Sequence, residues 1–187
     1  IARGLGIPED DLPAWTTRAP DRFSAAIKTL ALAGSFAAEE GSYRGVPVSS
    51  ARSHFNLSNS IWRLPDLVIA RPEGQVHLDG RENTATLEYL WVIRSQVDPK
   101  ALEPLLDPEQ KSVLDLFAFS QPPLIQGRVW GEWRRPDRVG FSAEVALTNF
   151  TFRSEVFDSF SASLQFTNQF LDLRDVDVRR GKGQITA

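Results

Sequence analysis

The chain of 187 residues contains neither cysteine nor methionine. Without cysteine it can form no disulfide, no thiolate nucleophile and no cysteine-ligated metal site. This fits an oxidising compartment, where stray thiols are a liability, although some cytosolic chains also lack cysteine by chance. Because residue 1 is not methionine, we expect the sequence to be a piece of a longer chain that continues before Ile1 and after Ala187.

Long apolar runs and a strong charge imbalance are also absent. No run of about 18 apolar residues occurs, so we expect no membrane span within the sequence. Lys and Arg total 21 against 24 Asp and Glu, and this net charge of −3 argues against nucleic acid as the main partner. The glycine-rich phosphate-binding motifs GxGxxG and GxxxxGK[ST] are missing. The composition, 42% hydrophobic and 24% charged, is that of an ordinary folded protein.

Alternation of apolar and polar residues is the clearest pattern and predicts β-strands. In TLEYLWVIRSQV (86–97), the side chains of Tyr89, Trp91 and Ile93 share one face. The segments 124–133, 139–148 and 160–166 alternate in the same way. RRPD (134–137) is expected to be a turn, and a change of phase at Arg174 and Asp175 indicates a bulge or a tight turn before Val176. Residues 1–20 give no periodic signal, and 23–38 fit a strand or a helix.

Two short helices are expected at about 99–118. Asp98-Pro99 and Asp107-Pro108 each combine a capping acid with proline at the first helical position. Gln110 stands three residues after Asp107, where the partner of a capping box belongs. Leu102, Leu105 and Leu106 form one apolar stripe. Val113, Leu114 and Phe117 form a second.

The chain resembles itself at an offset of 109 residues. Segment 43–78 aligns with 152–187 without a gap, and the apolar phases of the two segments match. A strand–turn–strand–turn unit that recurs along a chain is typical of stacked arrays. The alternative is that two similar β-meanders arose in one sandwich by convergence. The identical pairs are Arg44/Arg153, Ser50/Ser159, Asn59/Asn168, Leu64/Leu173, Asp66/Asp175, Arg71/Arg180, Gly74/Gly183 and Gln75/Gln184.

The repeated phrase resembles the AsmA-like family of bacterial envelope proteins, which includes the TamB-like proteins. It reads LQFTNQFLDLRDVDVRRGKGQITA in the second copy and FNLSNSIWRLPDLVIARPEGQVHL in the first. The resemblance covers about 124–187 well and 30–97 more loosely, and it leaves the two helices and residues 1–22 unexplained. It implies a mainly β fold with a long, curved antiparallel sheet of groove-like meander repeats, to which the capping residues above add a short two-helix insertion.

On this reading, residues 1–187 are one β-rich part of a longer chain. The first meander repeat spans 23–97, the helices and a connector span 98–123, and the second repeat spans 124–187. The resemblance implies a non-enzymatic periplasmic protein, anchored to the inner membrane by a segment outside this sequence. Its partners would be phospholipid or another acyl lipid, and envelope or outer-membrane proteins, with no cofactor and no metal. The expected groove-lining residues are Phe55, Leu57, Phe141, Val145, Leu147, Phe160, Leu164 and Phe166.

Other candidate chemistry is weaker. His54 and His77 lie opposite apolar neighbours in predicted strands, with no acid or nucleophile at catalytic spacing, so we interpret them as solvent-facing. The acids Asp98, Glu103, Asp107 and Glu109 could in principle contain a glycosidase pair, but capping explains two of them. The five tryptophans could stack on sugars, although packing explains them more simply. The alternative function is therefore a carbohydrate- or protein-binding β-sandwich at the cell surface.

Overall fold

The computed structural model describes residues 30–187, which form an antiparallel sheet and two short helices. The predicted mainly β fold with a two-helix insertion is confirmed. Expectations for residues 1–29 lie outside the described residues. The elements are β1 (Leu32–Tyr43), β2 (Val46–Ser58), β3 (Ile61–Arg71), β4 (Gly74–Asn83), β5 (Glu88–Ser95), η3 (Pro99–Leu105), α3 (Pro108–Leu114), β6 (Phe117–Phe119), β7 (Leu124–Glu132), β8 (Arg135–Phe152), β9 (Glu155–Thr167), β10 (Phe170–Arg180) and β11 (Gly183–Thr186).

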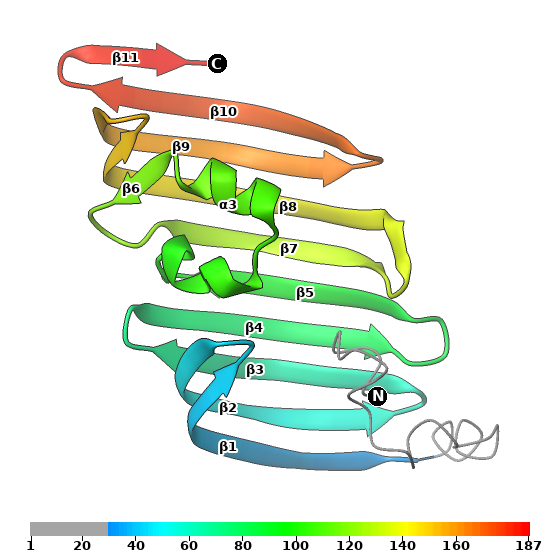
Figure 1. Cartoon of the computed structure of the whole chain (residues 1–187). Coiled ribbons are helices and arrows are strands. Elements are labelled where there is room, and N and C mark those ends of the chain that lie inside the picture. Colours follow the sequence, from blue (N-terminus) through cyan, green and yellow to red (C-terminus); the bar gives the residue numbers. More distant parts are fainter. Residues whose placement is uncertain (1–29) are drawn as a thin grey trace.

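The 11-stranded sheet is open, and its strand order follows the chain (Figure 1). Each strand pairs with the next one along the chain, except that β5 pairs with β7 and the short β6 pairs with the far end of β8. The β5–β7 step is the one that the two helices bridge. Residues 30–187 form no second sheet facing this one, so the described part of the chain is not a sandwich.

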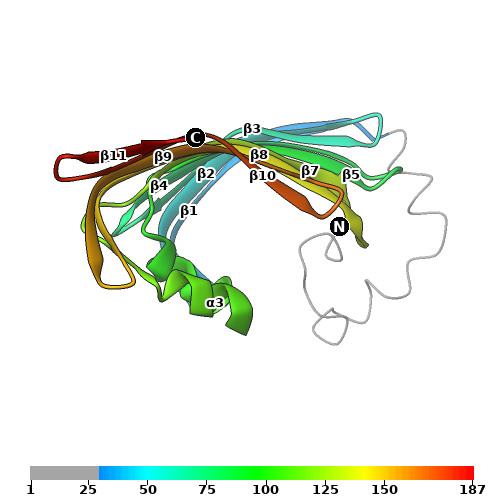
Figure 2. The same cartoon turned by 90° about the horizontal axis from the view of Figure 1, so that it is seen from above.

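The sheet curves along the length of its strands, as the view from above shows (Figure 2). The two helices lie on the inner, concave side of this curve. Their attachment identifies the face: Arg71 donates from Nη2 to the carbonyl oxygen of Ala101 in η3, at 3.1 Å. The residues that share a sheet face with Arg71 therefore point to the concave side.

Strand burial follows the predicted period of two. In β5 the exposed and half-buried side chains alternate without a break, and Tyr89, Trp91 and Ile93 are the half-buried ones. The intervening Leu90, Val92 and Arg94 are exposed on the convex face. The predicted face of this strand is therefore confirmed, although β5 begins at Glu88 and ends at Ser95.

The strand boundaries recur at the predicted offset of 109 residues. Adding 109 to the bounds of β2 and β3 gives the bounds of β9 and β10. The hairpin turns match as well: Asn59 and Ser60 have φ of 49° and 63°, and Asn168 and Gln169 have 52° and 65°. Two consecutive residues of positive φ define the two-residue hairpin turn whose twist suits flanking strands. The two segments thus share one strand–turn–strand pattern.

Both copies also share two irregularities. Glu40 in β1 and Asn149 in β8 have φ of 53° and 48°, and ladder pairing skips one step at each. The later irregularity is one extra residue relative to the preceding strand, which lies between Arg63 and Val68 in β3 and between Arg174 and Asp177 in β10. Such a bulge bends the strand and shifts the phase of its side chains. Of the two predicted alternatives at Arg174 and Asp175, the structure has the bulge and not the tight turn.

The helices begin where the capping residues predict. The Asp98 carboxylate accepts from the backbone N–H of Lys100, and Asp107 and Gln110 form a reciprocal capping box. The predicted extent to residue 118 is wrong. Helix α3 ends at Leu114, and Phe117 belongs to β6 because its backbone pairs with Phe152 in β8. Tertiary pairing therefore overrides the helical spacing of this side chain.

The turn expected over RRPD is displaced toward the N-terminus. Arg134 takes the left-handed conformation with φ of 69°, and β8 already begins at Arg135. Glu132 and Arg135 are the closing pair of this hairpin. Pro136 therefore lies at the beginning of a strand, where the missing N–H of proline is tolerated.

Candidate functional site

The six predicted lining residues of the second repeat lie on one face of β8 and β9. Directly opposite residues of an antiparallel pair share a face. Ladder pairing sets Phe141 opposite Phe166 and Leu147 opposite Phe160. The rings of Phe141 and Phe166 stack with centroids 5.3 Å apart. The predicted register is therefore confirmed, and the remaining pairs of this block are Ala143 with Leu164 and Val145 with Ala162.

Phe55 and Leu57 lie on the same face, in the first repeat. Leu57 is 2% exposed, and the ring of Phe55 lies 5.9 Å from that of Trp62. The face can be followed across the sheet because cross-strand partners, and residues two apart in one strand, point to the same side. The path from β2 to β8 runs through Leu57, Trp62, Glu82, Tyr89, Trp91, Val129 and Phe141.

This face is the concave one. Ile69 and Arg71 are two apart in β3, and Ile69 pairs with Val76, which pairs with Ser95 two residues beyond Ile93. Arg71 therefore shares the face of the apolar side chains, and it is 7% exposed. Its guanidinium donates to the carbonyl oxygens of Pro47 at 2.6 Å and Ala101 at 3.1 Å. Arg71 thus ties η3 to the ends of β2 and β3.

The concave face is only half-buried. Both helices contain no buried residue, and Val113 in α3 is 59% exposed. Within residues 30–187, the fully buried apolar side chains are few. Most aromatic and aliphatic side chains of the face are partly exposed. They are less buried than the side chains of a protein core and less exposed than those of an ordinary surface. The buried apolar residues are Val46, Leu57, Val97, Leu147, Phe150 and Ala162.

Three aromatic rings of this face lie over glycines of the neighbouring strand. The clearest is Trp91 opposite Gly80, where a Cβ on the glycine would come within 2.3 Å of the indole. Tyr89 covers Gly131, and Phe55 covers Gly34, in the same way. A missing side chain on one strand therefore lets a large ring lie flat on the next. The predicted lining omitted Trp62, Tyr89, Trp91, Ile93 and Val129, although their period-two spacing was visible in the sequence.

A cluster of five phenylalanines forms where β6 joins the end of β8. The members are Phe117, Phe119, Phe150, Phe152 and Phe157, and Phe150 is 4% exposed. The β8–β9 hairpin that carries three of them bends toward the helix side of the sheet (Figure 2). This cluster was not predicted, although the motifs FAF and FTF mark its position in the sequence.

At the β7–β8 turn, Tyr89 and Trp133 pack with ring centroids 4.6 Å apart. Burial raises the pKa of the Tyr89 hydroxyl above its ordinary value. The indole N–H of Trp133 is buried and has no hydrogen-bond partner among the described residues. This end of the concave face is therefore both aromatic and poor in polar partners.

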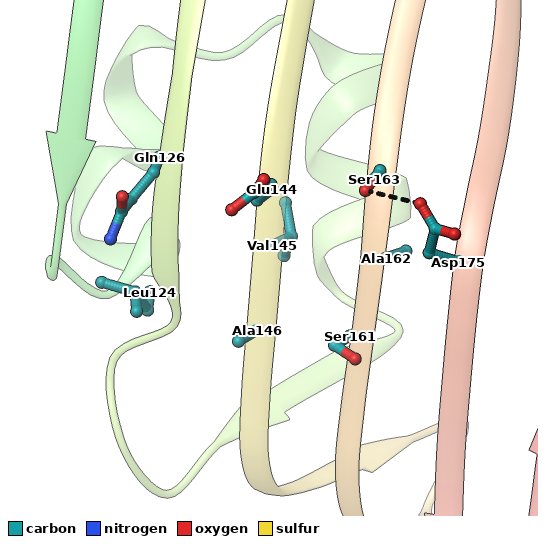
Figure 3. Close-up of a pocket in the computed structure, with 9 residues that line it drawn as sticks. All are labelled: Leu124, Gln126, Glu144, Val145, Ala146, Ser161, Ala162, Ser163 and Asp175. Carbon is teal, nitrogen blue, oxygen red and sulfur yellow. Dashed lines mark hydrogen bonds between the residues drawn. The ribbon is translucent and has the colours of Figure 1, made fainter.

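The convex face mixes polar and apolar side chains. A hollow of about 250 Å³ opens between β7, β8, β9 and β10, on the side of the sheet away from the helices (Figure 3). Gln126, Glu144 and Ser163 are cross-strand neighbours in it, and Ser163 donates to Asp175 at 3.3 Å. None of the eight predicted lining residues points to this side. Val145 borders the hollow, but its side chain lies on the concave face with that of Ala162.

His54 is exposed, as predicted, but it has a partner that sequence reasoning missed. Its Nδ1 lies 2.6 Å from Asp66, whose other carboxylate oxygen accepts from the backbone N–H of His54 at 2.8 Å. These hydrogen bonds, the backbone one foremost, lower the pKa of the Asp66 carboxyl. Asp66 reaches His54 because it lies at the β3 bulge. The signal was its alignment with Asp175 at the second bulge.

The structure offers no constellation for metal chemistry in residues 30–187, where no group of three or more His, Asp or Glu side chains converges. Asp98 and Asp107 are occupied as helix caps. In the same part of the chain, neither helix has the length and apolar character needed to cross a bilayer. The most extensive feature of the described chain is its concave apolar face.

Comparison with known proteins identifies no relative. No protein-family model matches the chain, and neither a curated protein nor a solved structure shows significant similarity to it. The function must therefore be argued from the two faces of the sheet.

Proposed function

We propose that the chain is a non-enzymatic lipid-binding β-groove, in which the concave face accepts the acyl chains of phospholipid or a similar lipid. One observation carries the proposal. The apolar concave face continues from β2 to β9 and remains half-exposed, with only two weakly packed helices over it in residues 30–187. An apolar face of this extent favours an apolar occupant over water.

The energetics suit an acyl chain. Burying one methylene is worth roughly 0.8 kcal/mol, so a face of aliphatic and aromatic side chains can hold a lipid tail without specific polar ligands. The open strand order supports this function as well, because the apolar side chains of both repeats lie on one continuous face. A lipid could then occupy successive positions along the sheet.

The resemblance to the AsmA-like family extends the proposal to a setting. There the chain would be a periplasmic part of a longer protein, anchored to the inner membrane. It would support lipid passage or outer-membrane assembly together with envelope proteins. The open curved sheet and the 109-residue recurrence of its strands favour this assignment over a carbohydrate-binding sandwich, which needs a second sheet.

Lipid extraction from the purified chain tests the proposal. We expect copurifying acyl lipid, detected by native mass spectrometry and by mass spectrometry of the organic extract. Phe166→Glu places a carboxylate on the concave face, where desolvation disfavours it, and should lower lipid recovery about tenfold or more. Gln165→Glu is the matched control, because it introduces the same residue one position away on the convex face.

Circular dichroism of both variants must show the parental β content, so that lost binding is not lost folding. A parental chain that remains lipid-free when offered vesicles or detergent would contradict the proposal. Equal lipid loss from the Phe166 and Gln165 variants would also contradict it, because the effect would then not depend on the face.

A further inference from the structure

The convex face carries an arginine patch that covers the first repeat and the first strand of the second, and that the groove does not use. The patch consists of exposed arginines on five consecutive strands of the sheet, β2, β3, β4, β5 and β7. They are Arg52, Arg63, Arg81, Arg94 and Arg128.

Ladder pairing places these arginines on one side. Arg52 pairs with Val68, which pairs with His77, and His77 pairs with Arg94. Arg128 belongs to the parallel row that passes through Val92 and Ser142. Strands lie about 4.8 Å apart, so five strands spread the charge over roughly 20 Å. The charge is therefore laid out as a plane and not gathered around one point.

Two of the arginines oppose each other directly. Arg63 in β3 and Arg81 in β4 are cross-strand partners, an arrangement that destabilises a sheet when both residues carry the same charge. Within residues 30–187 neither has a hydrogen bond or an ion pair. By contrast, Arg174 and Arg179 on β10 are each paired with an aspartate two residues earlier. An unrelieved like-charge pair is a cost to the free protein that an anionic partner would remove.

Several acids share this part of the face, but none forms an ion pair with the patch in residues 30–187, and Glu88 and Glu144 stand on neighbouring rows of β5 and β8. Asp66 is engaged with His54, and Asp79 lies in the row of Val92 and Arg128 without an ion pair in the described chain. Apolar side chains stand between the arginines: Leu90 is 38% and Val92 40% exposed. Trp130 lies beside them, with the Arg128 guanidinium 6.0 Å from its ring.

We propose that this convex arginine patch docks on a bilayer surface that contains anionic phospholipid. A plane of arginines matches a plane of phosphates, to which guanidinium groups bind with two parallel hydrogen bonds. The interleaved Leu, Val and Trp side chains suit the boundary between headgroups and acyl chains. The patch lies on the opposite side of the sheet from the concave face, so both faces can be occupied at once.

Vesicle binding by the full chain tests the proposal. We expect cosedimentation with phosphatidylcholine–phosphatidylglycerol vesicles, weakened by salt, and little with phosphatidylcholine alone. The double variant Arg63→Gln, Arg81→Gln should lower the partition coefficient about 10- to 30-fold, from the contribution of each basic residue near an anionic surface. The control double variant Arg174→Gln, Arg179→Gln removes the same charge from two arginines that are already paired with aspartates. It should change the partition coefficient by less than about threefold.

Thermal melting supplies a second readout, because removing the opposed charges should leave the Arg63/Arg81 variant as stable as the parent or more so. Phe166→Glu should bind vesicles like the parent, which separates this surface from the proposed groove. Binding that does not require phosphatidylglycerol would overturn the proposal. Failure to bind either vesicle, with retention on immobilised polyglutamate, would overturn it in favour of an acidic protein partner.

Discussion

The two copies of the 109-residue unit have the same local structure but different surroundings. In the first copy Arg71 is 7% exposed and holds η3 to the sheet, whereas its counterpart Arg180 is exposed and pairs with Glu155 beside the ring of Phe157. Trp62 in β3 is half-buried, but its counterpart Leu171 in β10 is 53% exposed. The outer edge of β10 pairs with β11 only from Asp177 onward.

This comparison separates what the local sequence determines from what neighbours determine. The lengths of β2 and β3 recur in β9 and β10, and so do the positive-φ turns that precede each of these strands, so the local pattern of these segments suffices for them. Burial does not recur, because it depends on the strand or helix that comes to lie alongside. The same repeat position therefore holds an arginine that anchors η3 to the sheet in the first copy, Arg71, and a surface arginine in the second, Arg180.

The largest expected difference concerns Gly74 and Gly183. Gly74 has φ of 145°, and a Cβ there would lie 1.9 Å from the carbonyl oxygen of Gln96. Gly183 lacks both constraints, since its nearest such contact is at 3.3 Å. Gly74→Ala should lower the free energy of unfolding by about 3 kcal/mol or more, and Gly183→Ala by less than about 1 kcal/mol. Urea denaturation measures both, and equal losses would show that the second β-turn is as constrained as the first.

The next difference concerns the paired arginines. Arg71→Ala removes a nearly buried side chain together with its hydrogen bonds to the carbonyl oxygens of Pro47 and Ala101, and should cost about 2 to 4 kcal/mol. Arg180→Ala breaks an exposed ion pair and should cost less than about 1 kcal/mol. Limited proteolysis of the 99–114 segment is the discriminating measurement. Cleavage should accelerate in the Arg71 variant alone, and unchanged cleavage would show that this arginine does not hold η3.

The sequence predicted most of the fold because period-two alternation depends only on local residues. The faces of β5, β8 and β9, the helix caps and the β10 bulge all follow from such patterns. Three features could not be predicted. They are the place of Phe117 in a strand, the cluster of five phenylalanines, and the pairing of Arg63 with Arg81 across two strands. Each depends on which strands pair and in what register, and a bulge in β3 moves that register by one residue.

A smaller effect should be common to both copies. The second turn residue is Ser60 in one hairpin and Gln169 in the other, and both adopt positive φ, which favours glycine. Gln169→Gly should raise the free energy of unfolding by about 0.4 to 1 kcal/mol. Ser60→Gly should give a similar gain. The backbone carbonyl oxygen of residue 60, which accepts hydrogen bonds from the N–H and the hydroxyl of Thr84, is unchanged in this variant. Thermal melting checks both, and a loss in either variant would show that its side chain, not its backbone, stabilises that turn.

The smallest expected effect distinguishes the two bulge aspartates by pH. Asp66 accepts from the His54 backbone N–H at 2.8 Å and contacts Nδ1 at 2.6 Å, whereas Asp175 accepts from Ser163 at 3.3 Å. Because the pKa of Asp66 lies below its ordinary value of 3.8, its ionised form stabilises the fold above that pH. This stabilisation is lost as the pH falls through the lowered pKa. Asp66→Asn should therefore flatten the acid limb of the stability curve, measured by urea denaturation at successive pH values, more than Asp175→Asn does. An equal change in both variants would contradict this prediction. It would mean that His54 stabilises the ionised Asp66 no more than Ser163 stabilises the ionised Asp175.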